Sequence, residues 1–189
     1  MGAVSAAARR LRMLAAAWLL TCGLGASGAV LAAPTPAQVE AVFLFNFTQF
    51  VDWPPEAFAG PGSPIVIGVL GSDPFGAALD EVVRGEVVNG HPLVVHRAQR
   101  VEELADCQVL FIGRSERAHL APVLAALKGR NILTVSDLDE FANHGGMICF
   151  VLVDNKVRLR VNVEAAKAAG LTLSSKLLRF AQIVGPGEL

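Results

Sequence analysis

Residues 41–55 read AVFLFNFTQFVDWPP, a dense run of apolar and aromatic side chains that ends at a tryptophan and two prolines. The apolar spacing is helical, but the apolar positions are too many for one narrow stripe. This helix is therefore expected to be largely enveloped by the rest of the domain or by a partner. Pro54 disfavours helical geometry at Trp53, so the helix is predicted to end at or just before Trp53.

The N-terminal 32 residues are typical of a secretory signal peptide rather than of a folded domain. Three arginines, at positions 9, 10 and 12, precede an apolar stretch at 13–24, and Val30-Leu31-Ala32 provides a cleavage site before Ala33. A membrane-spanning helix needs about 20 apolar residues, and this stretch is shorter and runs into glycine and serine. We therefore predict a cleaved signal at 1–32 and an exported protein.

Two alternatives for this N-terminal segment remain open. The first is an uncleaved membrane anchor. The second is a lipoprotein, because Leu19-Leu20-Thr21-Cys22 resembles a lipobox that would lipidate Cys22. Threonine directly before the cysteine fits that motif poorly, so the lipoprotein is the less favoured prediction.

Length and charge limit what the remaining chain can be. Without residues 1–32 the chain keeps 157 of its 189 residues, enough for one domain with a proper core. The removed segment holds three arginines and no acids, so the formal net charge falls from −1 to −4. A mildly acidic exported domain does not suit a nucleic-acid partner, which needs a basic face. Residues 33–189 are predicted to form a single domain.

Cys107 and Cys149 are the cysteines that remain after the signal. Export places them in an oxidising compartment. However, the strands near them are not neighbours in a doubly wound sheet, so the distance needed for a disulfide is not expected to be met. Two buried thiols are the prediction, with an intramolecular disulfide as the alternative.

Strands and helices alternate after a loop rich in Pro and Gly at 54–64. The predicted strands are 65–70, 92–97, 109–112, 132–135, 147–153 and 157–163. The predicted helices are 75–83, a helical stretch around 101–105, 113–128, 138–143 and 174–183. This alternation predicts an α/β fold, a single layered domain with a mostly parallel sheet and helices on both faces. The last two strands flank Asp154-Asn155-Lys156 and predict an antiparallel hairpin at one edge.

Catalytic and metal-binding signatures are missing from the sequence. It has no G-x-S-x-G, no H-E-x-x-H, no phosphate loop ending in Lys-Ser/Thr and no cysteine pair at zinc spacing. The four histidines, at 91, 96, 119 and 144, belong to different predicted elements, and we expect them to be solvated or hydrogen-bonded. We predict no catalytic residue, no metal and no cofactor, and an enzyme is the least favoured class of function.

Polar residues follow three of the predicted parallel strands where those strands end. Ligands bind near the carboxyl ends of such strands, close to a reversal of strand order. Helix N-termini there present free N–H groups to anions, and an arginine adds a bidentate cation. These residues could form a crevice for a small anionic ligand, or each Ser and Asp could simply cap its own helix. The six residues are Ser72, Asp73, Arg114, Ser115, Ser136 and Asp137.

Arg158 and Arg160 alternate with apolar residues in the last predicted strand, so both face the same side. One interpretation is a solvated edge that resists pairing with other strands. The other is a contact surface for an acidic partner. Further apolar residues near the C-terminus are candidates for a homodimer or partner contact: Leu177, Leu178, Phe180 and Ile183.

The chain resembles the YfiR family of exported bacterial proteins over about residues 38–185. The resemblance rests on segments in a fixed order: AVFLFNFTQFVDWP, IVIGVLGSDPFG, VLFIGRSE, ILTVSD, GGMICFVLVDNKVRLRVN and AGLTLSSKLLRFAQIV. None is decisive alone, but their order and spacing together are specific.

The resemblance implies a periplasmic negative regulator without catalytic activity. Such proteins restrain a membrane diguanylate cyclase by binding its periplasmic sensor domain, and their release raises cyclic di-GMP and biofilm formation. The resemblance also implies a mixed sheet flanked by helices, and often a dimer. This chain departs from the family in its cysteines: the family's best-known member uses disulfides for stability, whereas only two cysteines remain here after the signal. A periplasmic small-ligand sensor that uses the crevice described above is the alternative function.

Overall fold

The computed structural model describes residues 33–185, and the chain from Pro34 onward forms one compact unit. The predicted signal at 1–32, its cleavage site and Cys22 lie outside the described residues. Within residues 33–185, no helix has both the length and the apolar character that crossing a bilayer requires.

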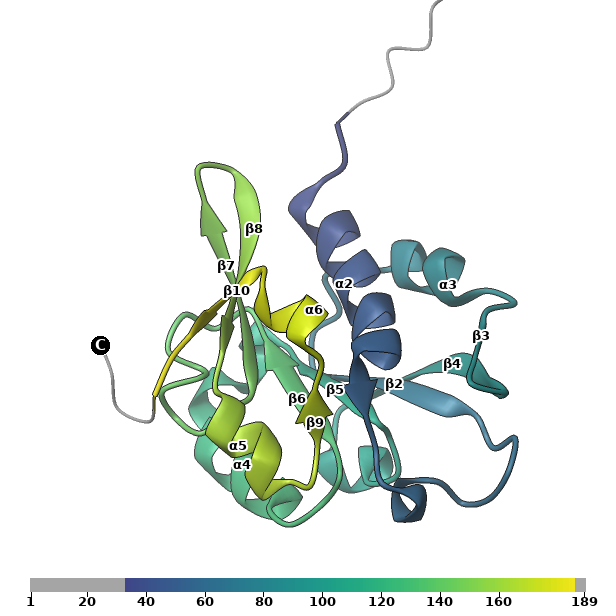
Figure 1. Cartoon of the computed structure of the whole chain (residues 1–189). Helices are drawn as coiled ribbons and strands as arrows, with labels where there is room; N and C mark the ends of the chain where they lie inside the picture. Colours follow the sequence, from purple (N-terminus) through teal and green to yellow (C-terminus); the bar gives the residue numbers. More distant parts are fainter. Residues whose placement is uncertain (1–32, 186–189) are drawn as a thin grey trace, which may run out of the picture. The chain divides into compact units, whose positions relative to one another are not determined.

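An eight-stranded sheet forms the centre of this unit (Figure 1). Its strands in spatial order are β10 (Ala181–Ile183), β8 (Lys156–Val161), β7 (Ile148–Val153), β6 (Leu133–Ser136), β5 (Val109–Ile112), β2 (Ile65–Leu70), β4 (His91–Ala98) and β3 (Val87–Val88). Neighbouring strands are parallel except that β7 with β8 and β4 with β3 are antiparallel. The mostly parallel sheet confirms the predicted fold class.

Helices cover both faces of this sheet. They are α2 (Pro36–Phe50), α3 (Ala77–Val83), α4 (Leu120–Leu127), α5 (Val163–Ala168) and α6 (Ser175–Leu178), together with 3₁₀ turns η1 (Pro55–Ala57), η2 (Val101–Leu104) and η3 (Arg114–His119). One face carries α2, α3, α5 and α6. The other face carries η2 and α4. A separate two-stranded sheet pairs β1 (Val51–Asp52) with β9 (Thr172–Leu173).

The central strands are apolar without a break because both of their faces are covered. In β5, Val109 and Phe111 point toward the α2 face, whereas Leu110 and Ile112 point toward the α4 face. Successive side chains of a strand alternate between faces, so a strand buried on both sides needs apolar residues throughout. The same reasoning explains the run IVIGVL of β2.

Helix α2 is the aromatic helix expected from the sequence. The Thr35 side chain accepts a hydrogen bond from the Gln38 amide at 3.3 Å, and the Gln38 side chain accepts one from the Thr35 amide at 2.8 Å. This reciprocal cap satisfies two donors at the helix start. The helix ends at Phe50, three residues before Trp53, because Val51 is extended and pairs with β9. Phe47 is fully buried, and its ring stacks on Phe43 and Phe150 with centroids 6.2 and 6.0 Å away.

One predicted helix is wrong and another is too long. Residues 138–143 form hydrogen-bonded turns instead of a helix, among them the Phe141 amide donating to the Leu138 carbonyl. The ring of Phe141 packs closely on Gly146, where any side chain would collide with it. The predicted helix at 174–183 ends at Leu178, and β10 follows it. The outer edge of β8 offers free backbone groups that β10 satisfies, and this long-range pairing overrides local helical periodicity.

Other differences concern the ends of the sheet and the start of α3. The predicted hairpin of β7 and β8 lies one strand in from the end of the sheet, because β10 covers it. Asp154 and Asn155 both have positive φ in its turn, which matches the tight two-residue connection. The sequence interpretation did not include β1, β3, β9, β10 or α5. Helix α3 begins at Ala77, two residues later than predicted.

We expect Phe47→Ala to lower the free energy of unfolding by about 3–5 kcal/mol, because it leaves a cavity between α2 and the sheet. Val42→Ala, on the exposed side of the same helix, is the control, and its effect should stay within about 0.5 kcal/mol. Urea unfolding followed by circular dichroism measures both. Equal effects for the two variants would show that this face of α2 is not part of the core.

Candidate functional site

Two regions of the surface are considered as candidate binding sites. We call the first the carboxyl-edge cluster: Glu40, Ser72, Asp73, Arg114, Ser115, Ser136 and Asp137. We call the second the aromatic groove: Phe43, Asn46, Phe47, Phe50, Val157, Arg158, Leu159, Lys176, Leu177, Arg179 and Phe180. The cluster lies where β2, β5 and β6 end, and the groove lies between α2, β8 and α6.

The carboxyl-edge cluster includes the point where strand order reverses. β2 pairs with β4 on one side and with β5 on the other, so the loops after β2 and β5 leave the sheet side by side. Open sheets commonly bind ligands in this crevice. Here the two loops contact each other directly: the Ser72 amide donates to Ser115 Oγ at 2.9 Å. Gly113 allows this approach, because a side chain there would collide with the Ser72 carbonyl.

The charged members of the cluster are engaged within the protein. Arg114 Nε donates to Asp137 Oδ2 at 2.6 Å, and its Nη2 donates to the Asp137 carbonyl at 3.1 Å. Asp73 accepts from the Phe75 and Gly76 amides and from Arg97 Nε, the last at 2.7 Å. Two pairs of the predicted residues thus meet at this edge, Ser72 with Ser115 and Arg114 with Asp137, whereas Asp73 is held by Arg97 and by backbone amides.

Ser136 and Asp137 occupy the end of β6. Ser136 is fully buried; its hydroxyl donates to the Ile112 carbonyl at 2.7 Å and accepts from the Leu138 amide at 3.2 Å. The Oδ1 atom of Asp137 is buried without a hydrogen-bond partner. Ser136 therefore fastens β6 to β5, while Asp137 keeps negative charge close to the core.

Glu40 is the titratable residue of this cluster that the sequence interpretation missed. Burial and, to a lesser extent, the nearby Asp137 carboxylate raise the pKa of Glu40, Arg114 lowers it in part, and the net pKa is about 7. The carboxyl group therefore takes up a proton near neutral pH. A signal was present in the sequence, since Glu40 is the only charged residue of α2.

The chemistry of the cluster does not favour an anionic ligand. Its single arginine is paired with Asp137, and its other ionisable members, Glu40 and Asp73, are acidic. An added anion would have to displace an internal carboxylate from Arg114. Among residues 33–185, no group of three His, Cys, Asp or Glu side chains is placed to hold a metal ion.

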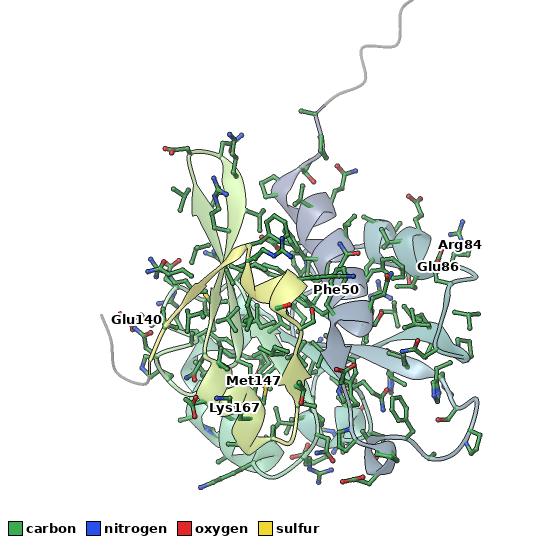
Figure 2. The ribbon with its side chains drawn as sticks, viewed as in Figure 1. Phe50, Arg84, Glu86, Glu140, Met147 and Lys167 are labelled. Atoms are coloured by element: carbon green, nitrogen blue, oxygen red, sulfur yellow. The ribbon has the colours of Figure 1, made fainter. Side chains whose placement is uncertain are left out.

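The aromatic groove is a hollow of about 590 Å³ with a largely apolar lining. Phe43, Phe47 and Phe50 come from successive turns of α2, and Val157 and Leu159 come from the matching face of β8. Figure 2 labels Phe50 near the end of α2, where the Ser174 amide donates to its carbonyl at 2.9 Å and brings α6 alongside. Lys176 and Arg179 of this C-terminal segment line the groove and are exposed.

The groove gathers some of the residues predicted for a partner surface and not others. Leu177 is buried and Phe180 is 76% exposed, and both line the groove with Arg158. Leu178 is partly buried against the core, and Ile183 lies exposed on β10.

Arg160 does not belong to the lining. Arg158 and Arg160 share one face of β8, as the sequence predicted, because they oppose Val151 and Cys149. The edge at Arg160 is not free, however, since Gln182 of β10 pairs beside it. The interpretation of this strand as a solvated edge that resists pairing is therefore wrong at Arg160.

Cys107 and Cys149 are both free, buried thiols. Strand β6 separates β7, which carries Cys149, from β5, which Cys107 precedes. Burial raises the pKa of Cys107 to about 12 and that of Cys149 to about 11. Little thiolate forms at neutral pH, so both side chains behave as apolar core residues.

Comparison with known proteins gives a family and a fold. A family model described as YfiR/HmsC-like matches residues 37–182. The comparison with curated proteins found no match. A similar solved structure is described as the ABC domain in complex with L-Trp from Streptococcus pneumonia, with a TM-score of 0.52 and 12% sequence identity. The alignment covers 79% of this chain and 61% of that one, and at this identity it supports the fold alone.

Glu40→Gln should change how stability depends on pH. Because the pKa of Glu40 is raised in the folded state, the free energy of unfolding of the unsubstituted protein falls as pH rises from about 4.5 to about 7. The variant lacks this loss, so its stability relative to the unsubstituted protein should increase by roughly 1–3 kcal/mol over that window. Urea unfolding at pH 4.5, 6 and 8 measures this, with Glu81→Gln at an exposed position of α3 as the control. Parallel pH profiles for Glu40→Gln and the parent protein would contradict the assignment.

Neither Cys107 nor Cys149 should react with a thiol reagent at pH 8 while the protein is folded, and both should react in urea. Their burial and raised pKa values withhold the reactive thiolate. Peptide mapping by mass spectrometry identifies the labelled residues, and Ser175→Cys on the exposed side of α6 supplies a reactive control. A disulfide between the two residues, or rapid labelling of the folded protein, would contradict this.

Proposed function

The chain belongs to the YfiR/HmsC-like family, and we propose that it is a periplasmic regulator that restrains a membrane diguanylate cyclase by docking on the cyclase's periplasmic sensor domain. The observation that carries this proposal is the match to the family model over residues 37–182, which is most of the described domain. Membership fits a regulatory protein of cyclic di-GMP signalling rather than a catalyst.

Restraint of a cyclase requires a difference in affinity. A regulator shifts a partner's equilibrium only to the extent that it binds the inactive state more tightly than the active state. No group on the regulator has to react, and a rigid surface is sufficient. The layered core and the apolar aromatic groove are consistent with such a surface.

Self-association belongs to the same proposal. Ile183 is a large apolar side chain on β10 that is 60% exposed near the C-terminal end of the described chain. Large exposed apolar side chains are common at protein interfaces. We expect a homodimer to form through the face of the molecule that carries β10.

The small-ligand sensor is the second function considered. It needs free donors at the carboxyl-edge cluster, whereas Arg114 is paired with Asp137 and the Ser72 amide with Ser115. The ligand described for the Streptococcus structure is a property of that protein, and the likeness extends to the fold alone. No observation on this chain favours the sensor over the regulator.

Deleting the gene in the host should raise cellular cyclic di-GMP and surface biofilm, because an unrestrained cyclase populates its active state. Mass spectrometry of nucleotide extracts measures the change. Complementation with the full chain should restore the low level, and a chain without residues 1–32 should not, because it would stay in the cytosol.

The matched control is a host that also lacks the partner cyclase. A pull-down of the protein from membranes would identify this cyclase. In that strain, deletion of the regulator should have no effect. Unchanged cyclic di-GMP in the single deletion, with the protein expressed in the parent strain, would reject the proposed function.

A further inference from the structure

We propose that the aromatic groove binds an apolar segment of a partner protein that carries Asp or Glu beside its apolar side chains. This rests on the proposed function and deepens it, because it names the surface and the chemistry of the docking segment. Amphipathic segments that dock in apolar grooves are a common mode of recognition.

The floor of the groove supplies the apolar contact. Phe43 and Phe50 are only partly buried, although both pack against the core beside fully buried Phe47. Phe180 stands at the side of the groove with 76% of its surface exposed. Aromatic side chains in such positions contribute strongly to binding when a partner covers them.

The apolar surface continues from the groove toward the tip of the hairpin. Leu152 lies directly opposite Val157 in the β7–β8 ladder, so both side chains point to the same face. Leu152 is 57% exposed. Figure 1 shows this hairpin projecting past the ends of the neighbouring strands. An elongated occupant therefore fits better than a compact one.

The charges around the groove define the partner's chemistry. Lys176 and Arg179 line it and are exposed, whereas the Arg158 side chain alternates to the opposite face of β8; the lining contains no Asp or Glu. Neither Lys176 nor Arg179 forms an ion pair within residues 33–185. This cationic border belongs to a chain whose overall formal charge is −1. Carboxylates on the occupant would complement it, and complementary charge sets specificity and the rate of association.

A second copy of the chain does not suit this groove. In a two-fold dimer each surface meets its own equivalent, so Lys176 and Arg179 of one copy would face those of the other. Like charges placed together oppose association. A flat bilayer does not suit it either, because Phe43, Phe47 and Phe50 line a hollow instead of projecting from the surface.

Two synthetic helical peptides of 18 residues provide the test. Both carry the same Leu and Phe face; one has Glu along its flanks and the other has Lys. Fluorescence anisotropy with the purified full chain should give a dissociation constant about tenfold lower for the Glu peptide at low salt. Lys176→Glu combined with Arg179→Glu should abolish or reverse this preference. Phe180→Ala should weaken both peptides.

Lys128→Glu is the matched control, since Lys128 is an exposed cation at the end of α4 on the opposite face of the sheet. It should leave both dissociation constants within about twofold, because screening removes most long-range effects of a surface charge. Circular dichroism checks that each variant is folded. Binding of neither peptide, equal binding of both, or an equal effect of Lys128→Glu would overturn the assignment.

Two further measurements separate the other occupants. Vesicles of phosphatidylglycerol should not sediment the protein, and Phe180→Ala should not change its mass by light scattering. Lipid binding or loss of a dimer would overturn the assignment in favour of those occupants. In cells, Lys176→Glu with Arg179→Glu should raise cyclic di-GMP. Deletion of the gene could raise cyclic di-GMP while the double variant still restrains the cyclase. In that case the assignment of the groove as the docking surface is rejected and the proposed function stands.

Discussion

The structure depends on the packing of one aromatic helix against one sheet. The Phe47 ring lies between α2 and β7, stacked on Phe150 and Phe43, and is inaccessible to water. Burying aromatic side chains supplies a large share of the stabilisation available to a domain of this size. Because α2 is held there, its first half reaches the carboxyl ends of the strands and its second half forms a wall of the aromatic groove.

Helix α2 therefore links two regions of different chemistry. Glu40 belongs to the carboxyl-edge cluster, which is polar and whose arginine is already paired with Asp137. Phe43 and Phe50, one and three turns further on, belong to the groove, which is apolar and unsatisfied in the domain alone. The second region is the better candidate for binding a partner. Covering its exposed apolar surface lowers the free energy, whereas the paired polar groups of the first region would have to be separated before they could bind a partner.

The sequence predicted the parts of the fold that local patterns determine. Unbroken apolar runs located the central strands, and the proline at 54 placed the end of α2 within a few residues. Local patterns failed where contacts between residues far apart in the sequence determine the structure. Residues 181–183 have helical spacing with α6, yet they form β10 because the edge of β8 is available. The same holds for the candidate site. Local patterns predicted that the ends of β2, β5 and β6 meet, but Glu40 joins the cluster only because α2 packs against the sheet, which no local pattern shows.

The position of β10 has a consequence for shortened forms of the chain. This strand of three residues closes the outer edge of β8, which would otherwise present a row of free N–H and C=O groups beside the exposed hairpin. Bare edges of this kind recruit strands from other molecules. A proteolytic product or a designed fragment ending before Ala181 would therefore be prone to sheet-to-sheet polymerisation, even with its interior intact.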